Sequence, residues 1–158
     1  MQKITTFLWF DGNAEEAVNF YTSIFPDSRI GNVSRYGDAG PGPKGSVIVA
    51  PFELFGQQYL ALNGGPKYKF TPAISLVVNC ESQEEVDTYW SKLSDGGRED
   101  MCGWLQDKFG LSWQIIPTVL GKLIGDRDHP KKANAAMMAM LQMKKIDTKK
   151  LQDAFDNA

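Results

Sequence analysis

The sequence predicts an α+β protein built from two copies of one βαβββ unit and followed by helices. Two observations lead to this fold class: the order of extended and helical segments occurs twice, and similar residues recur at fixed offsets between the two copies. The chain has 158 residues, of which 42% are hydrophobic and 23% charged, as is typical of one ordinary globular domain. We therefore expect one folded core rather than a disordered chain.

The first predicted strand covers residues 4–10, because β-branched and aromatic side chains fill this segment and the turn sequence Asp11-Gly12-Asn13 ends it. Asn13 is then placed to accept a hydrogen bond from an early helical amide, and two glutamates follow where the helix dipole favours negative charge. Apolar residues recur at helical spacing until Pro26, so we predict a helix over residues 14–25. Three extended segments complete the unit, at about residues 29–36, 46–55 and 58–63.

The same order of elements begins again after a linker at residues 64–72 that contains glycine and proline. We predict a strand at 73–79, a helix at 83–94 and three short strands that end at Ile116. The second copy is therefore shorter in its middle region than the first.

Two internal offsets support a duplication. In the helices, Glu84 corresponds to Glu15, an offset of 69 that also superposes the first strands of the two copies. Near the end of each copy, Trp113 corresponds to Tyr59 at an offset of 54, and each follows a Phe-Gly pair. The alternative is a chance agreement between amphipathic helices and Phe-Gly turns.

These offsets give the predicted domain organisation. A paired domain covers residues 1–117, with a first module at 1–65 and a second at 66–117, and a helical tail at 118–158 belongs to the same domain. One face of the tail is rich in methionine, and we expect it to pack against the sheet or a second subunit; a cofactor site is the weaker alternative.

Composition excludes several classes of function. The net charge of −2, from 17 basic and 19 acidic residues, is too small to hold a polyanion, so we expect no nucleic-acid partner. No apolar run approaches the roughly 20 residues that cross a bilayer, and no signal peptide is recognisable, so we expect no membrane partner and a cytoplasmic protein. Cys80 and Cys102 are not in a CxxC motif, and we expect both to be reduced.

Four segments carry a resemblance to a known family: FLWFDGNAEEAVNFYTSIF at 7–25, ALNGGP at 61–66, AISLVVNC at 73–80 and CGWLQDKFGLSWQIIP at 102–117. They resemble the PhnB-like group of the vicinal oxygen chelate superfamily, also called glyoxalase/bleomycin resistance-like. Many members of this group are named 3-demethylubiquinone-9 3-methyltransferase. The similarity is expected to include the tail helices. It implies that the two modules form a curved, incomplete barrel around a pocket and that the protein is a homodimer.

The resemblance also implies where a metal would be bound. In metal-using relatives the first and last strands of each module supply His, Glu or Gln ligands, and these positions correspond here to Thr6, Leu60, Ser75 and Gln114. Hydroxyl groups and one amide compete poorly with water for a transition metal, and the lone His129 lies outside the repeats. We therefore expect neither a metal nor another cofactor.

Strand alternation then gives candidate pocket residues, because side chains two positions apart share a face. If Thr6 points inward, Phe7 and Trp9 face the helices, and the pocket is apolar with a few neutral hydrogen-bonding groups, which suits a small, partly apolar organic ligand. Each of these side chains also has a purely structural interpretation, as a strand residue or as a partner of a backbone amide. The candidate ligand-binding residues are Thr6, Leu8, Phe10, Gln58, Leu60, Ser75, Asn79 and Gln114, with Val77, Leu62 and Ile116 on the same predicted faces.

Three functions remain open. The first is a metal-independent small-molecule-binding protein, and the second is an enzyme that acts on a small organic substrate in the same cleft. For the enzyme, one histidine cannot complete a Ser-His-Asp triad, no glycine-rich nucleotide loop supports methyl transfer, and catalytic residues stay unknown. The third is a dimer whose tail recruits another protein. Acid–base chemistry would have to come from Asp11, Glu53, Glu81 or Asp107.

Overall fold

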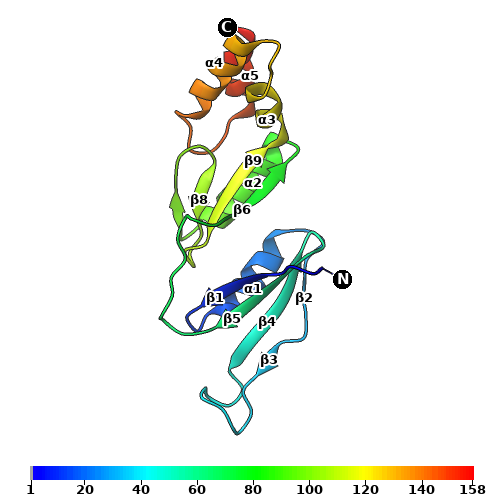
Figure 1. Ribbon diagram of the computed structural model, residues 1–158, viewed down its shortest axis with the longest axis vertical. Coiled ribbons are helices and arrows are strands. Elements are labelled where there is room, and N and C mark those ends of the chain that lie inside the picture. Colours follow the sequence, from blue (N-terminus) through cyan, green and yellow to red (C-terminus); the bar gives the residue numbers. More distant parts are fainter. Residues whose placement is uncertain (1) are drawn as a thin grey trace. The chain divides into compact units, whose positions relative to one another are not determined.

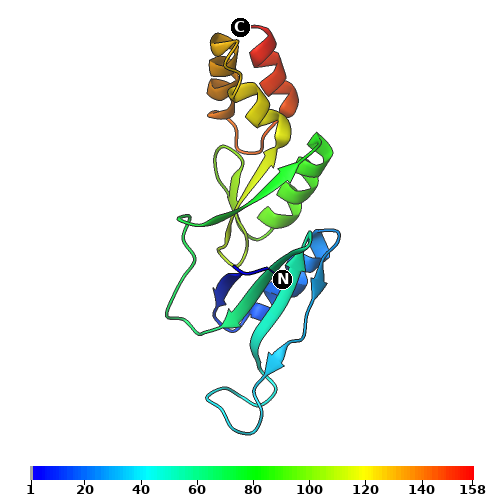
Figure 2. The ribbon, with the colours of Figure 1, turned by 45° about the vertical axis from the view of Figure 1, so that its right-hand side comes forward.

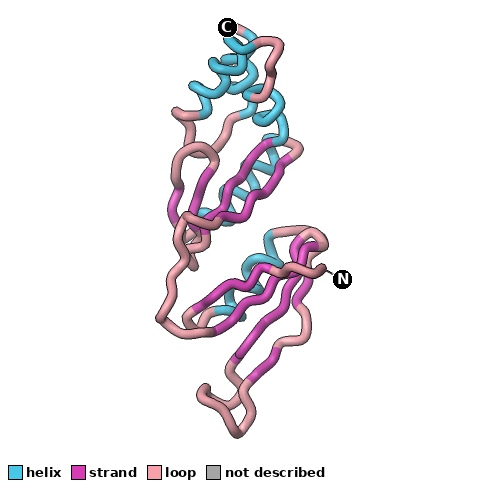
Figure 3. Tube along the Cα trace, viewed as in Figure 1, coloured by secondary structure: helices cyan, strands magenta, loops and turns pink. Residues whose placement is uncertain are grey.

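The computed structural model describes residues 2–158, and the chain divides into two compact units at the bond between Phe70 and Thr71. Figure 1 labels their elements, and Figure 3 marks the helices and strands by colour. Each unit contains one helix packed on one mixed sheet, and the second unit also carries the C-terminal helices. The α+β class with two βαβββ units is confirmed.

The first unit has a mixed sheet in the order β1-β5-β4-β2, with β3 also paired to β4. Only the pairing of β1 with β5 is parallel among the described pairs of this sheet, and β1 lies at the sheet edge. Phe55 and Gly56 both have positive φ, at 48° and 76°, and form the two-residue turn between β4 and β5. The elements are β1 (Thr6–Phe10), α1 (Ala14–Ile24), β2 (Arg29–Ile30), β3 (Ser34–Arg35), β4 (Val47–Leu54) and β5 (Gln57–Asn63).

Aromatic stacking joins α1 to the sheet of the first unit. The Tyr21 ring stacks on Phe52 of β4 with 6.1 Å between centroids, and Phe52 stacks on Tyr59 of β5 at 5.2 Å. Figure 2 shows α1 along one face of this sheet. Phe52 and Tyr59 therefore define the face of the sheet that α1 covers, and we call the opposite face, which no described helix of this unit covers, the open face.

The start of α1 is capped differently from the prediction. Asn13 occupies the N-cap position, but its side chain makes no capping hydrogen bond. Asn63 at the end of β5 accepts the hydrogen bond from the Ala14 amide at 2.9 Å, and its own amide donates to the Val47 carbonyl at 3.1 Å. A cap from a residue distant in sequence cannot be read from the local motif.

The second unit has a sheet in the order β6-β9-β8-β7, in which β6 and β9 are parallel. Its helix α2 begins with a cap from Ser82, whose side chain accepts from the Glu85 amide at 3.2 Å. The elements are β6 (Ser75–Cys80), α2 (Gln83–Ser94), β7 (Arg98–Glu99), β8 (Trp104–Gln106), β9 (Ser112–Pro117), α3 (Thr118–Ile124), α4 (Pro130–Met140) and α5 (Thr148–Asp156).

The tail helices α3, α4 and α5 form their own apolar cluster, centred on Leu120, Leu123, Ala136, Ile146 and Leu151. Met140 and Met143 pack on this cluster, as does Ile116 of β9, and packing of the methionine face against a second subunit stays a prediction. Met138 is 57% exposed. Within residues 2–158, no helix is long and apolar enough to cross a bilayer.

The structure changes one of the two internal offsets. The helices still align at 69, but the Cα partner of Tyr59 in β1 is Thr6, whereas the Cα partner of its counterpart Trp113 in β6 is Leu76. The first strands therefore align at an offset of 70. The cause is the connection to the helix, which has three residues after β1 and two after β6. Ser75 corresponds to Thr5, and not to Thr6 as predicted.

Candidate functional site

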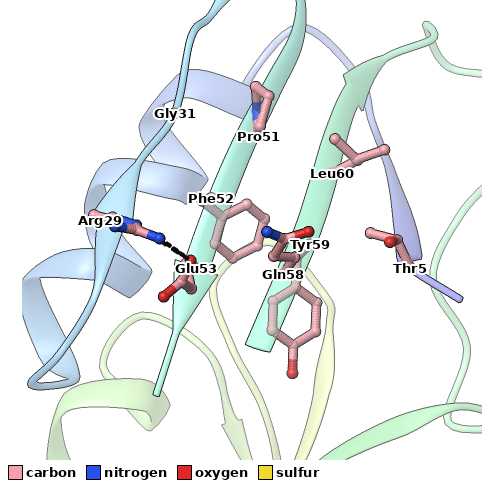
Figure 4. Close-up of a pocket in the computed structure, with 9 residues that line it drawn as sticks. All are labelled: Thr5, Arg29, Gly31, Pro51, Phe52, Glu53, Gln58, Tyr59 and Leu60. Atoms are coloured by element: carbon pink, nitrogen blue, oxygen red, sulfur yellow. Dashed lines mark hydrogen bonds and ion pairs between the residues drawn. The ribbon is translucent and has the colours of Figure 1, made fainter. Parts of the chain in front are cut away.

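A cavity of about 340 Å³ lies on the open face of the first sheet (Figure 4). Pro51 and Glu53 of β4 alternate with Phe52, and Gln58 and Leu60 of β5 alternate with Tyr59, so all four side chains leave the sheet on the face opposite α1. This volume is at the small end of the range for small-molecule pockets. The lining residues are Thr5, Arg29, Gly31, Pro51, Phe52, Glu53, Gln58, Tyr59 and Leu60.

An ion pair forms the polar end of this cavity. Arg29 donates from Nη2 to Glu53 Oε2 at 2.7 Å and from Nε to the same oxygen at 3.2 Å. The Glu53 side chain is 18% exposed, whereas the Arg29 side chain is 74% exposed. The two charges neutralise each other, but the guanidinium is the group that solvent and a ligand reach first.

The segment before β1 borders the cavity on the β5 side, across the sheet from Arg29. The side chain of Gln2 mimics a backbone partner for Gln58: its amide donates to the Gln58 carbonyl, and its carbonyl accepts from the Gln58 backbone amide, both at 3.0 Å. These bonds use the backbone of Gln58 and leave its side-chain amide free to meet a ligand. Thr5 follows in the same segment and lines the cavity with its hydroxyl group.

Three predicted pocket residues of the first unit lie on the wrong face. Thr6 is the Cα partner of Tyr59 and Leu8 that of Ala61, so both share the face that α1 covers, as does Phe10 by alternation. Leu8 and Phe10 are buried there, at 5% and 2% exposure, and Phe7 is 51% exposed on the open face. The predicted orientation of Thr6, Leu8 and Phe10 is therefore wrong, because a shift of one residue reverses every side chain in a strand.

Gln58 and Leu60 do line the cavity. Glu53 was considered only as an acid–base group, and the lining residues that sequence reasoning missed are Thr5, Arg29, Gly31, Pro51, Phe52 and Tyr59. Thr5 would have been found with the correct strand offset. The ion pair joins residues 24 positions apart, and no local pattern predicts such a contact.

In the second unit the predicted residues share one face of the sheet, and their role in a pocket stays a prediction. Ser75, Val77 and Asn79 of β6 share a face with Gln114 and Ile116 of β9, opposite to the buried Val78 and Ile115. The Gln114 amide donates to the Ser75 hydroxyl at 2.9 Å. Ser112 lies on the same face beside Ser75, and its buried hydroxyl finds no hydrogen-bond partner in the described part of the chain.

The four candidate acid–base carboxylates have different surroundings. Asp107 is 3% exposed and accepts hydrogen bonds from the amides of Phe109 and Leu111 and from the Trp113 indole, so it organises the β8–β9 connection. Glu81 accepts from the Thr118 hydroxyl at 3.3 Å. Asp11 lines a second hollow of about 660 Å³. Glu53 is the one of the four that faces the 340 Å³ cavity.

The second hollow also lies in the first unit, beside the glycine- and proline-rich connection between β3 and β4. Its main charged feature is an ion pair in which Arg35 binds both carboxylate oxygens of Glu15, at 2.5 and 3.2 Å. The hydrogen bond from Arg35 is the main cause that lowers the pKa of Glu15. Both side chains are about half exposed, so this pair resembles a surface salt bridge of small energetic value.

The family whose description is 3-demethylubiquinone-9 3-methyltransferase matches residues 2–116. The chain belongs to this family. A PhnB protein from Bacillus cereus is 47% identical, with a TM-score of 0.70, and the match covers 74% of this chain and 100% of that one. A search of the curated proteins gives no match.

More distant structures share the fold. A Pseudomonas aeruginosa protein is 22% identical with a TM-score of 0.62, and the match covers 74% of this chain and 98% of that one. The fosfomycin resistance protein FosX from Listeria monocytogenes, in complex with Mn(II) and sulfate, is 15% identical with a TM-score of 0.53, over 77% and 95% of the two chains. The expected inclusion of the tail in the similarity is not supported, since the family match ends at residue 116.

The residues at the expected ligand positions do not suit a transition metal. In the first unit they are Leu60 and Thr6, with Thr5 in place of Thr6 in the corrected alignment. In the second unit they are Ser75 and Gln114, which are hydrogen-bonded to each other. Leu60 has no metal-binding atom, and the Gln114 amide nitrogen donates to Ser75, so Gln114 offers only one neutral amide oxygen. Among the described residues, no group of three or more His, Cys, Asp or Glu side chains is placed to hold a metal ion. Neutral hydroxyl and amide groups are weak ligands for such ions.

Proposed function

We propose that this protein binds a small organic molecule without a metal and that the 340 Å³ cavity of the first unit is its binding site. The observation that carries the proposal is the combination of Leu60 and Pro51 as an apolar wall with Gln58 and the Arg29–Glu53 pair as polar groups. Such a mixture of apolar surface and a few placed polar groups is typical of small-molecule sites. Membership of the family and the shared fold are consistent with this function.

Metal independence rests on donor chemistry. A transition-metal site needs imidazole, carboxylate or thiolate ligands, and the positions at which the fold would place them carry threonine, leucine, serine and glutamine. Glu53, the cavity carboxylate, is occupied by Arg29. We therefore propose that hydrogen bonds and apolar contact supply the binding energy, and that Ser75, Asn79 and Gln114 contribute a second polar surface in the other unit.

A ligand screen on the purified protein tests the proposal. Ligand at a hundredfold its Kd stabilises the folded state by about 2.7 kcal/mol, which a thermal-shift assay detects. We expect a Leu60→Trp variant, which fills the cavity, to lose the response, and a Leu62→Trp variant on the same strand face but outside the cavity lining to keep it. Binding that EDTA abolishes, or that survives Leu60→Trp, would contradict the proposal.

We also propose that the protein is a cytoplasmic homodimer. In support, Ile4, just before the edge strand β1, is 88% exposed, and Phe7, within β1, is 51% exposed. An exposed apolar edge strand favours pairing with another chain. A second copy is the proposed occupant. Light scattering during size exclusion should give twice the 17.6 kDa chain mass, and the monomer mass would refute the dimer; cell fractionation tests the location.

A further inference from the structure

Among the described contacts, the Arg29–Glu53 pair leaves one edge of the guanidinium without a hydrogen-bond partner. A guanidinium carries five N–H donors in a planar fork. Glu53 Oε2 accepts from Nε and from Nη2, which are the two donors on one side of the fork. The remaining edge, formed by Nη1 and the second N–H of Nη2, presents two parallel donors. This pair of donors matches the spacing of the two oxygens of a carboxylate.

Glu53 also fixes the orientation of that edge. Its side chain is largely covered, at 18% exposure, and it holds the guanidinium through two hydrogen bonds to one oxygen. A long arginine side chain that is already fixed loses less conformational entropy when it binds a ligand. Glu53 is therefore a positioning residue for Arg29.

The cavity floor next to the pair is apolar. Pro51 is the Cα partner of Leu60, two pairs along the strands from Glu53 and Gln58, so the two pairs are neighbours on the same face. In Figure 4 the side chains of Arg29, Glu53 and Gln58 lie toward one end of the drawn strands, and Pro51 and Leu60 lie toward the other. The arrangement suits a molecule with one polar end and one apolar body.

We propose that the ligand is a small organic acid whose carboxylate binds the free edge of Arg29 and whose apolar body lies on Pro51 and Leu60. This inference rests on the proposed binding function of the cavity and names the chemical class of its ligand. The Gln58 amide, on the strand beside Glu53, supplies a further donor.

The exposures of the two charged groups decide between an anion and an amine. An amine would have to reach the remaining oxygen, Oε1, of Glu53, whose side chain is only 18% exposed, and it would lie beside the positive guanidinium. An anion meets Arg29, which is 74% exposed and has donors to spare. The corresponding position of the second unit differs. Ser112 is the counterpart of Gln58, and its Cα partner is the neutral Gln106 where Gln58 has Glu53. The second unit therefore has no carboxylate at the position of Glu53.

Three probes that share one ring system test the charge preference: 2-naphthoate, 2-naphthamide and 2-naphthylmethylamine. We expect titrations followed by amide chemical shifts to show naphthoate binding at least about tenfold more tightly than the other two, as expected of charge-assisted hydrogen bonds. Arg29→Lys keeps the charge but removes the fork, and it should abolish most of this preference. Arg98→Lys, at an exposed arginine paired with Asp100, is the matched control and should leave it unchanged.

The outcomes separate this inference from the function on which it rests. Equal or tighter binding of the amide or the amine overturns the carboxylate assignment, and so does a naphthoate preference that survives Arg29→Lys. If none of the three probes binds but other molecules stabilise the protein in a Leu60-dependent manner, the carboxylate assignment fails and the binding function stands. If no binding depends on Leu60, both fail.

Discussion

The buried carboxylate of Asp107 accepts a hydrogen bond from the indole N–H of Trp113, with 2.8 Å between Oδ2 and Nε1. Its other oxygen accepts from two backbone amides in the same turn. The carboxylate thus ties the β8–β9 connection to the core of the second unit, and its role is structural.

Replacing Asp107 with asparagine should destabilise the protein by about 2–4 kcal/mol, because the amide cannot satisfy both the indole and the two backbone donors. Urea unfolding measures the loss. Asp153→Asn is the control, since Asp153 is an exposed partner of Lys149, and it should cost less than about 0.5 kcal/mol. Equal effects of the two changes would refute the structural role of Asp107.

Gly64 packs against the indole ring of Trp9, and a Cβ atom at position 64 would overlap that ring. Trp9 is also held by a hydrogen bond from its Nε1 to the Gly65 carbonyl at 2.8 Å, so it cannot move away freely. We expect Gly64→Ala to cost about 1–3 kcal/mol in unfolding free energy and to shift the tryptophan emission.

Gly121 provides the opposite case for comparison. It lies in α3 and a Cβ atom there would meet no heavy atom within 4 Å, so Gly121→Ala should stabilise the protein by about 0.5–1 kcal/mol through helix propensity. A Gly64→Ala variant as stable as Gly121→Ala would show that the Trp9 ring is not fixed as described.

Sequence periodicity located the strands and helices well, since burial follows the apolar pattern in both units. It could not fix the register of β1, because Thr5 and Thr6 are the same residue type and either one matches Ser75. Only the pairing of β1 with β5 shows which threonine corresponds to Ser75. Phe7 and Val77 correspond at the offset of 70, and both are 51% exposed, which agrees with that offset. The Arg29–Glu53 pair was unpredictable for a related reason, since it depends on which strands become neighbours.

Burial raises the pKa of the Cys80 thiol to about 12, and the negative charges of Glu85 and Glu81 act in the same direction. The folded protein therefore retains a proton that the unfolded chain releases near its ordinary pKa of 9.0. Stability from this group is fully present below pH 9.0 and falls as the pH rises toward about 12. Urea unfolding at several alkaline pH values should show a steeper loss for the parent protein than for Cys80→Ala.

Burial also raises the pKa of Tyr59 and Tyr89, so the comparison with Cys80→Ala is needed to isolate the thiol. Thiol labelling gives an independent check. Cys80 is buried and Cys102 is partly exposed, so a thiol reagent at pH 8 should label Cys102 first and Cys80 only after denaturation. Rapid labelling of both thiols in the native protein would contradict the burial of Cys80.

Gln83 of α2 makes three hydrogen bonds to the tail, and an ion pair between Lys145 and Asp87 also joins the tail to α2. Gln83 donates from Nε2 to the Ile146 carbonyl at 3.0 Å, and its Oε1 accepts from both the amide and the hydroxyl of Thr148, at 2.8 and 2.9 Å. Gln83→Ala leaves these three part-buried groups without this partner, and water replaces part of the lost hydrogen bonding. We expect faster hydrogen exchange in residues 143–148 and an overall loss of about 1–3 kcal/mol.

Gln152→Ala on the exposed face of α5, where the side chain bonds only to Asp156 among the described contacts, is the matched control and should leave exchange in 143–148 unchanged. The segment has a further anchor, because the backbone amides of Cys102 and Gly103 donate to the carbonyls of Met143 and Lys144 at 2.7 and 2.8 Å. Exchange in Gln83→Ala should therefore rise most at 146–148 and least at 143–144. A uniform rise across the whole tail would instead indicate that the helices release as one body, and that Gln83 is their principal attachment.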